Sequence, residues 1–155
     1  MTADERKLLL DFLLGNEDAA NLCEDVLYVA HLWDDQIDRD RIRTDAEVNQ
    51  GWYKALVSIP RNPFYRQHFD LINPVVMIAI SDWMTATKYE RESPCLDKLA
   101  TAFVIRSSYL NVLVMCANIV GGSHYGASMA PALREIFHHE GLRTYRNRLK
   151  GKEYV

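Results

Sequence analysis

Apolar residues recur every three or four positions along most of this chain, and this spacing limits its fold more than any other feature. Leu22, Val26, Val29, Trp33 and Ile37 form one such series. Residues three or four apart share one face of an α-helix, whereas a half-buried strand alternates apolar and polar residues. That alternation is absent from the sequence, which therefore predicts an all-α protein.

Glycine, proline and capping residues divide the series into a compact bundle of five to seven helices. Gly15-Asn16 closes the first helix, and Thr44-Asp-Ala-Glu47 resembles a capping box. Asn73-Pro74 is expected to interrupt the fourth helix, because proline disfavours continuation of a helix. The expected helices cover about 3–14, 17–40, 44–59, 63–92, 94–120 and 131–149.

Length and composition indicate one globular domain. The chain has 155 residues, of which 48% are apolar and 25% charged, so residues 1–155 are predicted to form a single domain. No apolar run reaches the roughly 18 residues of a membrane span, and the first residues lack the apolar core of a signal peptide. The three cysteines include no Cys-x-x-Cys pair, which favours neither a disulfide framework nor a zinc site. A cytoplasmic location is expected.

The charge distribution is uneven. Net charge is −3, but residues 1–47 carry 13 acidic and 5 basic side chains, and residues 141–155 carry 5 basic and 1 acidic. An acidic protein is not expected to bind nucleic acid broadly. The basic end has two interpretations, a solvated helix terminus or a contact with phosphate.

The most informative segment is His31-Leu-Trp33-Asp34-Asp35-Gln-Ile-Asp38. Aspartate is a poor helix former, and residues four apart such as Asp34 and Asp38 lie on one helical face and repel each other. A bound Mg²⁺ or Mn²⁺ would reverse the repulsion, because hard cations prefer carboxylate oxygens. The alternative is a solvated acidic helix end, whose ion-pair partners would be Arg39, Arg41 and Arg43.

Asp34-Asp35-Gln-Ile-Asp38 resembles the DDxxD motif of isoprenoid (terpenoid) synthases, which are all-α enzymes that bind Mg²⁺-diphosphate. The resemblance implies that Asp34 and Asp38 hold the metal on a helix lining a cavity. A second metal motif of that family is matched in part, by Asp82 and Glu90 with Ala86 between them.

The length of the chain also suits a different family. Asp35-x-x-Asp38 resembles an acidic pair of the all-α nucleotide pyrophosphohydrolases, both MazG-like and dimeric dUTPase-like. In those compact bundles, acidic pairs on two helices bind Mg²⁺. This second resemblance again implies chemistry on a diphosphate.

Polar residues within apolar helices extend the candidate site. Asp82 follows an apolar run and needs a partner, either a shared metal or a pairing with Arg106 or a hydroxyl group. Arg106 is predicted either to bind a diphosphate or to neutralise Asp82. Ser107, Asn111 and Asn118 share one face of the fifth expected helix, where they contact either a ligand or polar groups of a neighbouring helix.

These features predict a Mg²⁺-dependent enzyme that acts on a phosphorylated small molecule bearing a diphosphate. The alternative is a non-catalytic helical domain that binds another protein or serves a structural role. A homodimer is expected in either case, with part of the fifth helix in the interface. The expected catalytic residues are Asp34, Asp35, Asp38 and Asp82, the metal ligands Asp34, Asp38 and Asp82, and the substrate-binding residues Arg106, Asn111 and Trp33.

Overall fold

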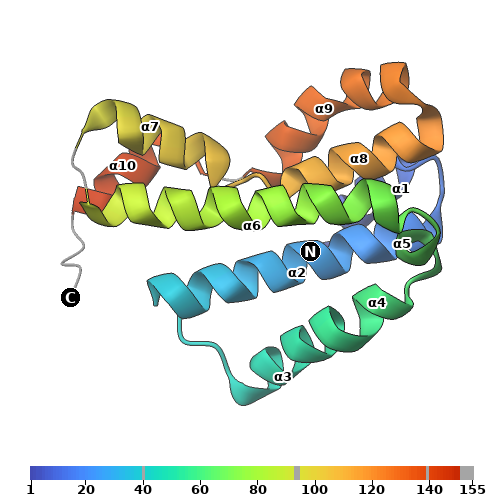
Figure 1. The fold of residues 1–155 in the computed structure, drawn as a ribbon, viewed down its shortest axis with the longest axis horizontal. Coiled ribbons are helices and arrows are strands. Elements are labelled where there is room, and N and C mark those ends of the chain that lie inside the picture. Colours follow the sequence, from blue (N-terminus) through green and yellow to red (C-terminus); the bar gives the residue numbers. More distant parts are fainter. Residues whose placement is uncertain (40, 93–94, 139, 151–155) are drawn as a thin grey trace.

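The computed structural model describes residues 1–39, 41–92, 95–138 and 140–150, and every regular element within these ranges is helical. The all-α prediction is confirmed, although the described residues form more helices than the five to seven expected (Figure 1). In chain order they are α1 (Ala3–Phe12), α2 (Glu17–Asp38), α3 (Asp45–Tyr53), the π-helical segment η1 (Lys54–Ser58), α4 (Ile59–Arg61), α5 (Pro63–Gln67), α6 (Phe69–Glu92), α7 (Leu96–Ile105), α8 (Leu110–Gly121), α9 (Ser123–Phe137) and α10 (Leu142–Lys150).

Side-chain caps fix the beginnings of the N-terminal helices. The predicted capping box before α3 is present, since the Thr44 backbone N–H donates to Glu47 Oε2 at 2.9 Å and the Glu47 N–H donates back to Thr44 Oγ1. Thr2 and Glu5 form a second box before α1, and Asn16 accepts the N–H of Ala19 at the start of α2.

The predicted interruption at Asn73-Pro74 is wrong. The chain breaks earlier, at His68, and Pro74 lies inside α6. A proline there removes one hydrogen bond within the helix. Ile72, Ala79 and Trp83 are buried on the same helix, so tertiary packing holds α6 together across the proline.

The fifth expected helix, over 94–120, is divided into α7 and α8, which are bent by 43° across residues 106–109. This bend carries Arg106 and Tyr109 toward α2 and α6. The last expected helix, over 131–149, is likewise divided, into α9 and α10. Within the described ranges no single helix has the length and apolar character to cross a membrane, and α7 and α8 reach that threshold only as a bent pair.

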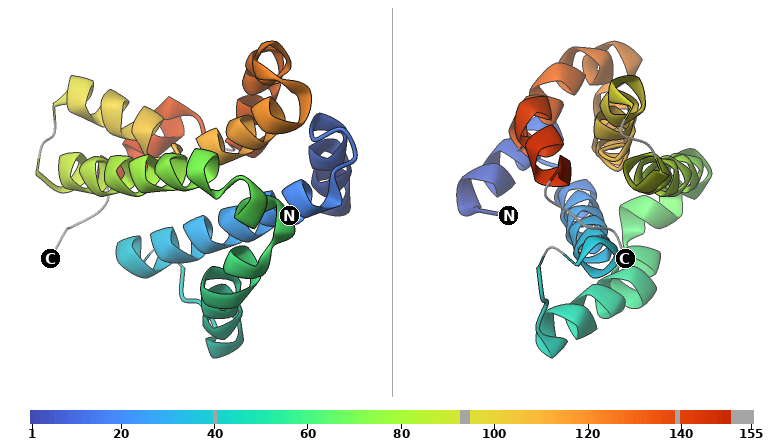
Figure 2. Two further views of the ribbon diagram at one scale, coloured as in Figure 1. Left: turned by 45° about the vertical axis from the view of Figure 1, so that its right-hand side comes forward. Right: turned by 90° about the vertical axis from the view of Figure 1, so that its left-hand side faces the viewer.

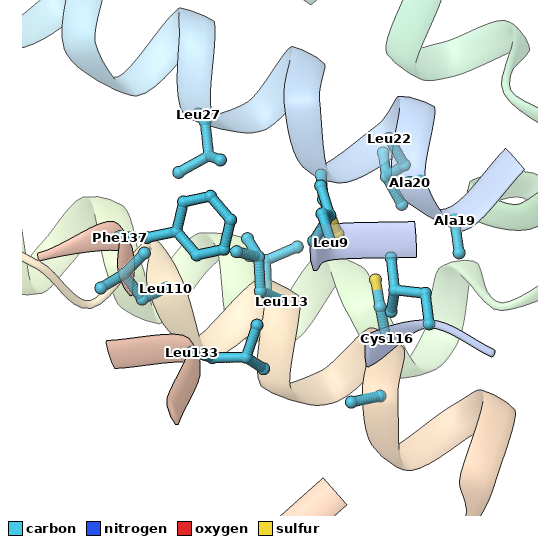
Figure 3. Packing of buried hydrophobic residues seen from close by; sticks show 14 of the residues in the cluster. Leu9, Ala19, Ala20, Leu22, Leu27, Leu110, Leu113, Cys116, Leu133 and Phe137 are labelled. Carbon is cyan, nitrogen blue, oxygen red and sulfur yellow. The ribbon is translucent and has the colours of Figure 1, made fainter. Parts of the chain in front are cut away.

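The main core lies where α1, α2, α8 and α9 meet. Leu9, Leu27, Leu113, Leu133 and Phe137 converge there from these four helices (Figure 3). Two further views show α3 and α4 on the side of α2 opposite α9 (Figure 2). A smaller apolar cluster joins α6, α7 and α10 and consists of Ala86, Ala102, Tyr145 and Leu149.

Candidate functional site

One buried guanidinium group joins three helices. Arg106, at the bend between α7 and α8, contacts Asp34 and Asp38 of α2 and Glu90 near the end of α6. Its Nη2 lies 2.8 Å from Asp38 Oδ2. These four side chains are called the Arg106 cluster below. Asp34 and Asp38 reach the same partner because residues four apart lie on one helical face.

Apart from Asp34, the side chains of the Arg106 cluster are buried, and the cluster carries excess negative charge. Side-chain exposure is 1% for Glu90, 2% for Asp38, 10% for Arg106 and 33% for Asp34. Three carboxylates and one guanidinium give a formal charge of −2. Burial of the guanidinium opposes its charge, but Asp34, Glu90 and Asp38 outweigh this effect and raise the pKa of Arg106. Arg106 therefore stays charged.

Two aromatic side chains complete the hydrogen bonding. Trp83 Nε1 donates to Asp34 Oδ1 at 2.9 Å, and the hydroxyl of Tyr145 on α10 donates to Glu90. Burial and then the bond to Glu90 raise the pKa of Tyr145 above its ordinary value, so this hydroxyl keeps its proton. The C-terminal basic helix is thereby attached to α6.

The structure separates the predicted site residues into different groups. Asp35 pairs with Arg43 at 2.5 Å, which is the ion pairing proposed as the alternative to metal binding. Asp82 accepts a hydrogen bond from Ser108 Oγ at 2.5 Å, so its partner is a hydroxyl group. Neither aspartate contacts Arg106.

The polar side chains at positions 107, 111 and 118 all have hydrogen-bond partners within the protein. Asn111 Oδ1 accepts from Arg134 Nη2 on α9 at 2.5 Å. The Ser107 hydroxyl donates to the Val104 carbonyl, and the Asn118 amide donates to a carbonyl of its own helix. Asn111 therefore contacts a neighbouring helix, and it is absent from the lining of the cavity described below.

No three His, Cys, Asp or Glu side chains in the described parts of the chain are arranged to hold a metal ion. Asp34 and Asp38 contact the guanidinium of Arg106, and Asp35 contacts that of Arg43. As placed, these carboxylates do not form a ready Mg²⁺ site. The metal site expected from the sequence stays a prediction, and it requires Arg106 to leave the carboxylates.

A cavity of about 330 Å³ adjoins the Arg106 cluster. Trp33 of α2 and Trp83 of α6 form part of its wall, with ring centroids 4.3 Å apart and planes inclined by 32°. Two members of the Arg106 cluster, Asp34 and Arg106, also line this cavity. The remaining lining is largely apolar and includes Val26, Val29, Ala30, Ile59, Val76, Ala79, Ile80, Val112 and Phe137. A mostly apolar cavity with a few charged groups is typical of small-molecule sites.

A tyrosine–histidine pair also lines this cavity. His31 Nε2 lies 3.3 Å from the Tyr109 hydroxyl. Burial, together with the negative charge of Asp34, raises the pKa of Tyr109 to about 12. At neutral pH the phenol is thus protonated and can donate a hydrogen bond.

The sequence indicates Asp34, Asp38, Arg106 and Trp33 as site residues but not Tyr109 or Tyr145. It indicates Glu90 only through its spacing from Asp82, outside the expected site. A usable signal existed, because Glu90 continues the buried helical series of Ala79, Trp83 and Ala86. A carboxylate in such a series requires a buried partner.

Comparisons with family models, with curated proteins and with solved structures find no match to this chain. The geometry of the cavity and of the Arg106 cluster is therefore the basis for any functional inference.

Proposed function

We propose that this protein binds an organic small molecule in the cavity between α2, α6 and α8. The apolar body of the ligand lies against Trp33 and Trp83, and its polar group lies beside Asp34. The observation that carries this proposal is the junction of an apolar cavity of about 330 Å³ with a charged cluster at its wall. Ligand sites of this size combine apolar walls with a few orienting polar groups.

The energetics of the fold support the proposal. Burying three carboxylates with one guanidinium costs desolvation free energy, and such networks contribute little net stability compared with apolar packing. Aromatic side chains beside a cavity also lose dispersion contacts on that side. A ligand in the cavity supplies these contacts. The cavity and the Arg106 cluster can therefore bind a ligand as well as hold α2 against α6.

Binding can be tested with n-octanol as a neutral probe, read out by tryptophan emission and by thermal melting. We expect octanol to shift the emission of the protein and to raise its melting temperature, because a ligand that binds only the folded state stabilises it. Ala79→Phe places a ring in the cavity and should remove both effects. Ala79 is 9% exposed and lines the cavity.

The matched control is Ala127→Phe. Ala127 is exposed on α9 and is absent from the cavity lining, so this variant should bind octanol as the wild type does. Equal binding by the Ala79→Phe variant would place the probe elsewhere, and a wild type that does not respond would refute the proposal.

A second candidate function is the Mg²⁺-dependent chemistry on a diphosphate that the sequence predicts. It is favoured by one observation: Asp34 and Asp38 of α2 and Glu90 of α6 all contact the guanidinium of Arg106. Thermal melts with Mg²⁺ and inorganic diphosphate, separately and together, test it. Joint stabilisation that is absent in Asp38→Asn supports this function, and identical melts under all conditions exclude it.

The interaction-domain alternative has its own support in exposed apolar side chains. Leu56 is 68% exposed, Met77 61% and Val104 61%. Val104 lies on α7, within the stretch predicted to take part in a homodimer. Sedimentation at tens of micromolar should show a dimer, which Val104→Glu should dissociate. A monomeric wild type would contradict this prediction.

A further inference from the structure

We propose that the cavity selects a ligand whose polar group is an organic cation, such as an alkylammonium. This inference rests on the proposed function, because it specifies the ligand of the same cavity. Three separate observations support it: the charges near the cavity, the aromatic side chains of its wall and the hydrogen-bond capacity of Asp34.

The formal charges of the aspartate, glutamate and arginine side chains in the described lining balance, as Asp34 and Glu140 against Arg106 and Arg148. Two further carboxylates, Asp38 and Glu90, contact Arg106 without lining the cavity and make the surroundings negative in sum. The Arg106 cluster has three carboxylates for one guanidinium, and Asp34 is its most exposed member. Glu140 and Arg148, which also line the cavity, form an ion pair at 3.1 Å. Because the charge of a half-buried carboxylate is screened less than one in bulk water, a cation entering the cavity is attracted to Asp34.

The cavity wall offers aromatic surface as well. Trp33, Trp83 and Tyr109 line it, and the ring faces of such residues attract cations through their quadrupoles. Tryptophan provides the strongest attraction of the aromatic side chains. An ammonium group beside Asp34 is thus within the same cavity as two indole rings and a phenol.

Asp34 retains an acceptor for this group. Both hydrogen bonds that its carboxylate receives among the described residues, from Trp83 and from Arg106, end on Oδ1. The second oxygen, Oδ2, receives neither of them. Since a carboxylate oxygen accepts more than one bond, Asp34 can accept N–H donors from a ligand.

An anionic group finds poorer partners. Arg106 is shared by three carboxylates, and Arg148 is paired with Glu140. A neighbouring polar hollow of about 450 Å³ shares His31 and Phe137 with the cavity. Its basic residues also have acidic partners, namely Glu47 for Arg41, Asp35 and Glu47 for Arg43, and Asp25 for Lys54.

The test compares n-octylammonium, n-octanol and octanoate, which share one apolar chain and differ in the charge of the head group. Tryptophan emission gives the dissociation constant of each. We expect octylammonium to bind about tenfold more tightly than octanol, and octanoate to bind most weakly. In Asp34→Asn the affinity for octylammonium should fall to within about threefold of that for octanol.

The control variant is Asp11→Asn, which makes the same change at an exposed position of α1 outside the cavity lining. It should keep the wild-type preference. If octanol and octylammonium bind wild type equally, or octanoate binds best, the cation preference is overturned while the proposed function stands. If none of the three probes binds, both fail. The wild-type comparison decides these outcomes even if Asp34→Asn does not fold.

Discussion

Replacing Arg106 with leucine should destabilise this protein more than any other exchange of one arginine. The distance of 2.8 Å from Arg106 Nη2 to Asp38 Oδ2 corresponds to an attraction of about 6 kcal/mol at an effective dielectric constant of 20. Desolvation of the guanidinium offsets part of this attraction. Removing one partner of a buried ion pair costs about 3–5 kcal/mol. Arg106→Leu leaves three carboxylates without their shared cation, so we expect a loss in this range.

Urea unfolding at pH 7, followed by far-ultraviolet circular dichroism, measures this loss. A small domain is stable by about 5–15 kcal/mol, so the variant should remain folded with a much lower midpoint. Arg66→Leu, at an exposed position on α5, is the control and should change the free energy of unfolding by less than about 0.5 kcal/mol. A cost below about 1 kcal/mol for Arg106→Leu would show that the guanidinium does not compensate the carboxylates.

The double variant separates repulsion between carboxylates from lost packing. Glu90→Gln removes one negative charge and keeps a side chain that Tyr145 can still contact. Combined with Arg106→Leu, it should recover about 1–3 kcal/mol of the loss, because residues in one network couple by that amount. Losses that simply add in the double variant would contradict the electrostatic explanation.

Three further predictions concern other parts of the fold. Tyr109 favours the neutral phenol in the folded state, so its contribution to stability is complete below pH 10 and lost as pH rises to about 12. Absorbance at 295 nm should show late-ionising tyrosines, and Tyr109→Phe should remove the one that ionises near pH 12. A backbone hydrogen bond from Thr44 and then the Arg43 side chain lower the pKa of Glu47 to about 2. Its contribution to stability is therefore present above pH 4.5 and lost as pH falls toward 2. A Glu47 carboxyl that titrates near 4.5 by NMR would contradict this. Gly126→Ala would place a Cβ 2.8 Å from the Asn118 backbone nitrogen and should cost about 1–3 kcal/mol in chemical denaturation, whereas Gly141→Ala, with open space around the new Cβ, should cost much less.

The sequence predicts local structure where local interactions decide it. The capping box at Thr44 and Glu47 satisfies backbone groups within one helical turn, and the structure confirms it. The bend at residues 106–109 depends on contacts with α2 and α6, so no pattern within the segment 94–120 indicates it. Pro74 shows the converse, because a local breaker is overridden by the packing of α6.

In the candidate site too, the sequence predicts relations within one helix but not contacts between helices. The spacing of Asp34 and Asp38 indicates a shared helical face, and in the structure both side chains contact Arg106, while a metal shared between them stays a prediction. Their partner Arg106 lies about 70 positions away in the chain, and the sequence pattern gives no information on that pairing. The sequence therefore indicates three of the four residues of the cluster, but it predicts a diphosphate or Asp82 as the partner of Arg106.

Because the Tyr145 hydroxyl of α10 donates a hydrogen bond to Glu90, the position of α10 depends on the Arg106 cluster beside the cavity. The Tyr145 ring also lies 5.9 Å from the Arg106 guanidinium and 5.5 Å from that of Arg148, which itself lines the cavity. Any movement of Arg106 that accompanies ligand entry changes the contacts that hold α10 in place. Amide hydrogen exchange along α10 should therefore change when a ligand occupies the cavity, although Arg148 is the only residue of α10 in the described lining.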